Sequence, residues 1–110
     1  MYYKIKNMSD SLIDCAKEDD NIQAVYLFGS FAKDKADYKS DVDFAIICNT
    51  PANKSTRRNL YNSLETIYNE YLLEYDLAFT TTDKLYSNHN ITDINEVIRE
   101  EGILLWQREQ

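Results

Sequence analysis

Residues 22–48, IQAVYLFGSFAKDKADYKSDVDFAIIC, contain two apolar runs separated by a polar segment. The first run, Ile22 to Phe28, is partly β-branched and stops at Gly29, which is typical of a buried strand that ends in a turn. The second run, Asp41 to Cys48, predicts another strand of similar length. The polar residues 33–40 between them predict a loop, or a short helix followed by a loop. We therefore expect two successive strands in this segment.

Outside this segment, the hydrophobic pattern predicts several helices and two more strands. Lys54 to about Tyr71 is the longest helical stretch, and Leu72–Phe79 indicates a third strand. A first helix is expected to be capped by Ser9 or Asp10 and to run to about Glu18, and a short helix is expected after Thr80–Asp83. A last helix is expected to start at Asp93, with Glu96 as its capping partner, and to end near Gly102. A terminal strand is expected at Ile103–Trp106. This order predicts an α/β (α+β) fold with a small mixed sheet flanked by helices.

The length, charge and apolar content of the chain argue against several classes of function. A chain of 110 residues is expected to form one domain, spanning residues 1–110. The 19 acidic residues against 12 basic ones argue against direct DNA or RNA binding, because phosphate backbones attract basic surfaces. The sequence has no apolar run of about 18 residues and no secretory signal at its start, so we expect a cytoplasmic protein that does not enter membranes. Cys15 and Cys48 are then expected to be reduced.

Acidic residues on two of the predicted strands suggest a metal site. Side chains alternate along a strand, so Asp41 and Asp43 project from one face. Adjacent carboxylates repel each other unless a cation lies between them, and Mg²⁺ prefers oxygen ligands of this kind. If the third strand is a neighbour, Asp76 reaches the same place. Glu74, two residues earlier and on the same face, is an alternative third ligand.

The residues directly after the first strand suit phosphate binding. Gly29 lets the backbone approach phosphate oxygens closely, and Ser30 adds a hydroxyl donor. Free amides at the start of a following helical turn attract anions. A phosphate held by this turn and a metal held by the acids would act on the same substrate.

These motifs resemble a known signature. Gly29-Ser30, ten further residues and then Asp41-Val42-Asp43 are similar to the motif of DNA polymerase beta-like nucleotidyltransferases, and in particular to the minimal nucleotidyltransferase (MNT) family. The likeness extends to Ala32, Ser40, Phe44, Tyr75-Asp76-Leu77 and the ending Glu101–Trp106. It therefore covers nearly the whole chain and implies a polymerase beta-like nucleotidyltransferase fold.

One position pair departs from the family pattern. Members usually continue Gly-Ser-x-Ala with Arg-Gly, whereas this chain has Lys33-Asp34. Lys33 keeps the positive charge without the guanidinium fork. Asp34 tolerates a left-handed backbone better than most residues, but it adds a negative charge near the expected triphosphate. This departure is expected to weaken the binding of the nucleotide, and it puts activity itself in question.

The resemblance implies a reaction in which an acceptor hydroxyl attacks the α-phosphorus of a nucleoside triphosphate, with ATP as the expected donor, and releases pyrophosphate. Asp41 and Asp43 would hold Mg²⁺ on the triphosphate, and with Asp76 they would hold a second ion. Asp76 would also take the acceptor's proton. Gly29, Ser30 and Lys33 would bind the nucleotide.

The resemblance also implies a partner. MNT proteins are often antitoxins that adenylylate a tyrosine of a HEPN-domain toxin. Two alternatives remain open: an inactive antitoxin that acts by binding and occlusion, and nucleotidyl transfer to a small molecule such as an aminoglycoside. Tyr61, Tyr68 and Tyr71, at helical spacing, are expected in the core or at an interface.

Overall fold

The computed structural model describes residues 2–37, 40–71, 73–87 and 94–109. The elements are, in order, α1 (Tyr2–Lys17), β1 (Ile22–Phe28), β2 (Val42–Cys48), α2 (Lys54–Tyr71), β3 (Tyr75–Thr81), α3 (Thr82–Ser87), α4 (Ile94–Glu101) and β4 (Ile103–Gln107). The strands form one sheet in the order β3-β2-β1-β4. β2 runs parallel to β3, whereas β1 runs antiparallel to β2 and β4.

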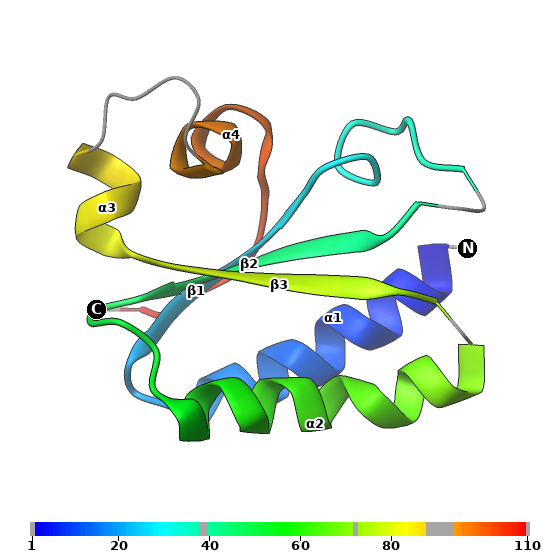
Figure 1. Cartoon of the computed structure of the whole chain (residues 1–110), viewed down its shortest axis with the longest axis horizontal. Helices are drawn as coiled ribbons and strands as arrows, with labels where there is room; N and C mark the ends of the chain where they lie inside the picture. The colour runs from blue at the N-terminus through cyan, green and yellow to red at the C-terminus, as the bar shows by residue number, and fades with distance from the viewer. Residues whose placement is uncertain (1, 38–39, 72, 88–93, 110) are drawn as a thin grey trace.

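Helices cover both faces of this sheet. α1 and α2 lie side by side against one face, and α3 and α4 lie over the other (Figure 1). The predicted α/β (α+β) class, a small mixed sheet flanked by helices, is confirmed. No helix in the described ranges has the length and apolar character needed to cross a bilayer.

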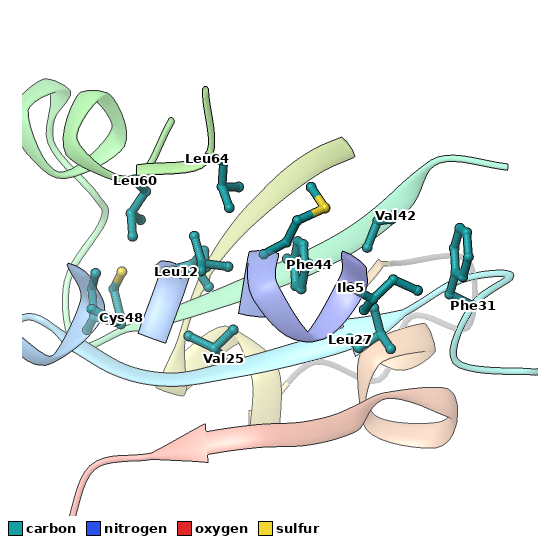
Figure 2. Close-up of a cluster of buried hydrophobic side chains, with 14 residues drawn as sticks. Ile5, Leu12, Val25, Leu27, Phe31, Val42, Phe44, Cys48, Leu60 and Leu64 are labelled. Atoms are coloured by element: carbon teal, nitrogen blue, oxygen red, sulfur yellow. The ribbon is translucent and has the colours of Figure 1, made fainter. Parts of the chain in front are cut away.

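The alternation of side chains along β2 separates two cores. Val42 and Phe44 are fully buried with Leu12 of α1 and Leu64 of α2 (Figure 2). The intervening residues Ala45 and Ile47 pack on the opposite face with Leu85 of α3 and Ile98 of α4. Odd-numbered residues of β2 therefore face α3 and α4, and Asp43 belongs to this set.

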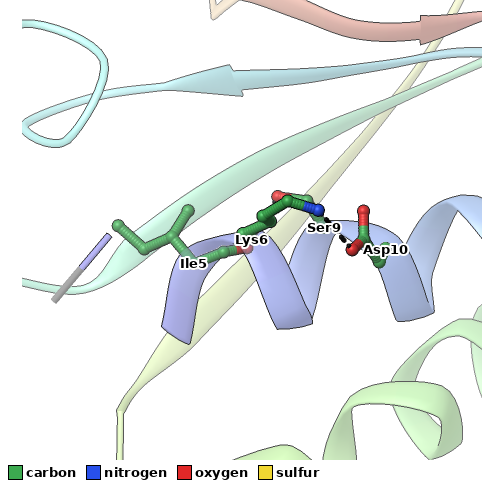
Figure 3. Close-up of polar contacts among 4 residues, drawn as sticks. All are labelled: Ile5, Lys6, Ser9 and Asp10. Carbon is green, nitrogen blue, oxygen red and sulfur yellow. Dashed lines mark hydrogen bonds and ion pairs between the residues drawn. The ribbon is translucent and has the colours of Figure 1, made fainter. Parts of the chain in front are cut away.

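The first helix begins earlier than predicted. Ser9 and Asp10 lie inside α1 and do not cap it. The Ser9 hydroxyl donates to the Ile5 carbonyl oxygen at 2.8 Å, and Lys6 pairs with Asp10 at 3.0 Å (Figure 3). Serine hydroxyls can bond the carbonyl one turn back within a helix. The apolar stripe continues upstream through Ile5, which extends the helix past the polar residues that suggested a cap.

Several boundaries differ by a few residues. β3 begins at Tyr75, not Leu72, and continues to Thr81. The last helix ends at Glu101, where the Gly102 N–H donates to the Ile98 carbonyl oxygen at 2.9 Å. The predicted cap Asp93 lies outside the described residues. Cys15 and Cys48 are both free thiols, as expected.

Candidate functional site

Asp43 and Asp76 are direct partners in the parallel ladder of β2 and β3. Neighbouring strands lie about 4.8 Å apart, so the two residues are adjacent. Both lie on the sheet face covered by α3 and α4. Asp76 is placed there because Tyr75 and Leu77 on either side of it pack against the opposite core. Thr80, four residues after Asp76 and on the same face of β3, donates a hydrogen bond to Asn95 of α4 at 2.5 Å.

Asp41 is the third acidic group at this place. It is exposed and immediately precedes β2. The pKa of Asp43 is raised, first by its burial and then by the negative charges of Asp76 and Asp41. Asp76 and Asp41 are therefore each close enough to Asp43 for their negative charges to act on it, and the structure brings together the acids that the sequence singled out.

Glu74 is directed elsewhere. The Tyr68 hydroxyl of α2 donates to Glu74 Oε1 at 3.0 Å, which holds this carboxylate on the α2 side of the sheet. Glu74 is not among the charges that raise the pKa of Asp43. The geometry thus favours Asp76 over Glu74 as the third member of the site.

The donor set suits a hard divalent cation. All three side chains offer carboxylate oxygens, the ligand type that Mg²⁺ prefers. A cation would also relieve the repulsion that raises the pKa of Asp43. Within the described part of the chain, no three His, Cys, Asp or Glu side chains are already grouped tightly enough to hold an ion. The candidate site rests on two other observations: the three acids lie at the same end of the sheet, and carboxylate oxygens are the ligands that Mg²⁺ prefers.

Gly29 places a tight turn against Asp43. β1 ends where Phe28 pairs with Asp43, and Gly29 follows with a φ of 77°. A Cβ atom at Gly29 would collide with Oδ2 of Asp43. The left-handed backbone and the adjacent carboxylate both favour glycine here, so the turn and the acids lie directly against each other.

The residues after Gly29 form a single helical turn. The N–H groups of Ala32 and Lys33 donate to the Gly29 carbonyl oxygen at 3.1 and 3.2 Å, and the Lys35 N–H donates to the Ser30 carbonyl oxygen at 2.9 Å. The first amides of such a turn have no acceptor within it. Ser30 is at this start, next to the carboxylates, where a phosphate would meet backbone donors.

The structure shows an ion pair of Lys33 and the backbone conformation of Asp34, the two residues that depart from the family pattern. Lys33 Nζ lies 3.2 Å from Glu101 Oε2 at the end of α4, so this cation is already paired. Asp34 has a φ of 57°, the left-handed conformation that glycine adopts most easily. Sequence reasoning missed Glu101 because 67 residues separate it from Lys33 and only the fold brings them together.

Comparisons with known proteins identify the family of the chain and structures that share its fold. The family model described as "Polymerase beta, Nucleotidyltransferase" matches residues 10–109. No curated protein matches the chain in sequence.

Solved structures share the fold at low sequence identity. A chain of a toxin–antitoxin complex with AMP-PNP is 19% identical and has a TM-score of 0.63, over 92% of this chain and 74% of that one. A chain from the tri-AMPylated Shewanella oneidensis HEPN toxin in complex with MNT antitoxin is 16% identical, with a TM-score of 0.55 over 92% and 71%. Spectinomycin adenyltransferase from Enterococcus faecialis, with ATP and spectinomycin, is 18% identical, with a TM-score of 0.62 over 94% of this chain and 48% of that one. At these identities the similarity establishes the fold.

Proposed function

Because the chain belongs to the polymerase beta nucleotidyltransferase family, we propose that it transfers AMP from ATP to a hydroxyl of a partner protein in a metal-dependent reaction. The observation that carries this proposal is the pairing of Asp43 with Asp76 beside the Gly29 turn. The proposal assigns these carboxylates to a metal, and the backbone donors of the turn at the same end of the sheet to phosphates.

Each residue of the site has its own role in the proposed in-line transfer. Asp41, Asp43 and Asp76 would hold two Mg²⁺ ions, which when bound neutralise the triphosphate and lower the pKa of the acceptor hydroxyl. The Gly29-Ser30 turn orients the phosphates. The acceptor oxygen forms a bond to the α-phosphorus, the bond from the α-phosphorus to the bridging oxygen breaks, and pyrophosphate leaves. Asp76 takes the acceptor's proton.

Structural neighbours suggest which acceptor to test. Toxin–antitoxin complexes, one of them with a tri-AMPylated HEPN toxin and an MNT antitoxin, share the fold of this chain. We propose the corresponding role, an antitoxin that adenylylates a tyrosine of a HEPN-domain toxin. The net charge of −7 also suits a basic partner.

A double-label experiment tests the transfer. The protein is incubated with Mg²⁺, ATP and the product of the adjacent gene, with the radiolabel placed on either the α- or the γ-phosphate. We expect α-label and no γ-label on the partner, because the γ-phosphate leaves with pyrophosphate. Label from γ-ATP would indicate phosphorylation, and α-labelling that survives EDTA would contradict the metal requirement.

Two other functions are separated by further assays. Spectinomycin adenyltransferase shares the fold, but this chain spans about half of its length. Transfer to a small molecule would be revealed by pyrophosphate release with aminoglycosides in the absence of any protein acceptor. Occlusion without chemistry would leave toxin neutralisation intact in an Asp43→Ala variant.

The ion pair between Lys33 and Glu101 predicts competition for the nucleotide. We expect Glu101→Gln to tighten Mg-ATP binding about twofold, because an exposed pair contributes about 0.5 kcal/mol and Lys33 is released to the phosphates. Isothermal titration calorimetry measures the change. The gain should vanish in a Lys33→Gln background, and a similar gain from the neighbouring control Glu100→Gln would contradict the pairing as its cause.

Asp34 allows the effect of charge to be separated from backbone conformation. Asparagine also tolerates a positive φ, so Asp34→Asn keeps the turn and removes the negative charge. We expect Mg-ATP to bind about two- to fivefold more tightly, since a nearby charge contributes up to about 1 kcal/mol in water. Calorimetry and melting temperature are compared with the exposed, distant control Asp20→Asn. Weaker binding by Asp34→Asn would show that the carboxylate assists the nucleotide.

A further inference from the structure

A pocket lies on the α2 side of β3. It has a volume of about 330 Å³ and is lined by Tyr61, Glu65, Tyr68, Asn69, Glu74 and Tyr75. The volume is at the lower end of the roughly 300–1,000 Å³ typical of ligand sites. The lining contains three aromatic rings and two carboxylates but no basic side chain.

The three tyrosines surround one another as a cluster. The ring centroids of Tyr61 and Tyr75 are 6.1 Å apart with the planes tilted by 35°, and those of Tyr68 and Tyr75 are 6.2 Å apart, edge to face. The Tyr68 hydroxyl is fixed by its bond to Glu74, and the Tyr75 hydroxyl donates to the Tyr61 carbonyl oxygen at 3.4 Å. These contacts hold the rings at set angles before any ligand binds.

The pocket carries uncompensated negative charge. Neither Glu65 nor Glu74 forms an ion pair with another described residue. Both carboxylates line the same pocket as the Tyr75 ring. Aromatic faces and carboxylates attract a cation together, and two carboxylates disfavour any phosphate-bearing ligand.

The position of the pocket relates it to the carboxylate site. Tyr75 and Asp76 are consecutive on β3, the outermost strand on this side of the sheet. Because side chains alternate, Tyr75 belongs to the pocket on one face while Asp76 belongs to the site on the other. A partner lying along the outer edge of β3 therefore contacts both.

We propose that this acidic tyrosine pocket binds an arginine side chain of the acceptor protein and thereby positions the acceptor hydroxyl near Asp76. A planar guanidinium stacks on tyrosine rings and donates to two carboxylates, which an ammonium group does less well. The positioning role rests on the proposed nucleotidyl transfer, whereas the binding of arginine does not.

Titration of the full chain with N-acetyl-L-arginine amide tests the pocket. Ring signals of Tyr68 and Tyr75, assigned through their Phe variants, are followed by NMR without ATP or metal. We expect saturable shifts of both rings and at least tenfold weaker binding of N-acetyl-L-citrulline amide, which has the same shape without the charge. The double variant Glu65→Gln/Glu74→Gln should also weaken arginine binding at least tenfold, while the control Glu70→Gln/Glu100→Gln should not change it.

The outcomes separate the pocket from the transfer reaction. Equal binding of citrulline, or unchanged binding by the double pocket variant, overturns the arginine site. In the labelling assay, the same variant should raise KM for the partner protein and leave kcat unchanged; an unchanged KM overturns the positioning role. If the wild-type chain labels no partner while the arginine titration succeeds, the transferase proposal fails and the pocket stands.

Discussion

Replacing Asp43 with Asn is expected to lower nucleotidyl transfer about a thousandfold or more and, at the same time, to stabilise the metal-free protein. Metal-ion stabilisation of a transition state is worth several kcal/mol, and each ~1.4 kcal/mol corresponds to a factor of ten in rate. Asp43 is at the centre of the site, paired with Asp76 in the sheet and in contact with the Gly29 turn. Under the proposed mechanism, the substitution removes a metal ligand without changing the shape of the side chain.

The gain in stability follows from the pKa of Asp43, which burial, Asp76 and Asp41 raise in the folded protein. Below the pKa that Asp43 has in the unfolded chain, its carboxyl is protonated in both states and carries no charge that destabilises the fold. As the pH rises through the folded pKa, the folded state must bear a half-buried charge that Asp76 and Asp41 repel, and the stability conferred by the protonated form is lost. Asp43→Asn should therefore melt at a higher temperature than the wild type near neutral pH, and the difference should disappear in acid.

Thermal melts with and without Mg²⁺ check this prediction separately from activity. Added Mg²⁺ should raise the melting temperature of the wild type, because an ion that binds only the folded state stabilises it. It should have little effect on Asp43→Asn. The control Asp14→Asn, an exposed site on α1, should keep both activity and the response to Mg²⁺. A wild-type-like Mg²⁺ response in Asp43→Asn would remove this residue from the metal site.

The fold could be predicted largely from local patterns. Apolar runs bounded by Gly29 and by polar turns place β1 and β2, and one apolar stripe places α2, because burial on a strand or helix leaves a periodic trace in the sequence. The start of α1 was predicted wrongly, since Ser9 looks like a cap but bonds back to Ile5 within the helix. A side chain that can serve either arrangement does not reveal which one occurs.

The site could be predicted only in part. The alternation rule brings Asp41 and Asp43 together and leaves Asp76 dependent on which strands are neighbours, a long-range property that the β2–β3 ladder supplies. The same rule places Glu74 with Asp76, but Glu74 precedes β3 and its side chain is drawn to Tyr68. The pairing of Lys33 with Glu101 has no local signal in the sequence, because it depends on how α4 packs across the sheet.

Gly29→Ala is expected to impair folding and activity together. Alanine at a φ of 77° is strained by about 1–2 kcal/mol, and its Cβ would collide with Oδ2 of Asp43. Relief of the collision requires the carboxylate to move, and a misplacement of about 1 Å can cost about a hundredfold in rate. We therefore expect a loss of about 1–3 kcal/mol in the free energy of unfolding and a loss of about a hundredfold in kcat/KM, measured by urea denaturation and by α-label transfer.

Two comparisons separate the collision from general destabilisation. At Gly102, a Cβ would collide with the Ile98 carbonyl oxygen and not with Asp43, so Gly102→Ala should destabilise the protein while its folded fraction keeps most of its transferase activity. In an Asp43→Ala background, the collision partner is absent, and Gly29→Ala should cost only the backbone strain. A smaller stability loss in that background than in the wild type measures the contact directly. If the two losses are equal, Gly29 does not position Asp43, and the phosphate turn and the carboxylates must be treated as separate features.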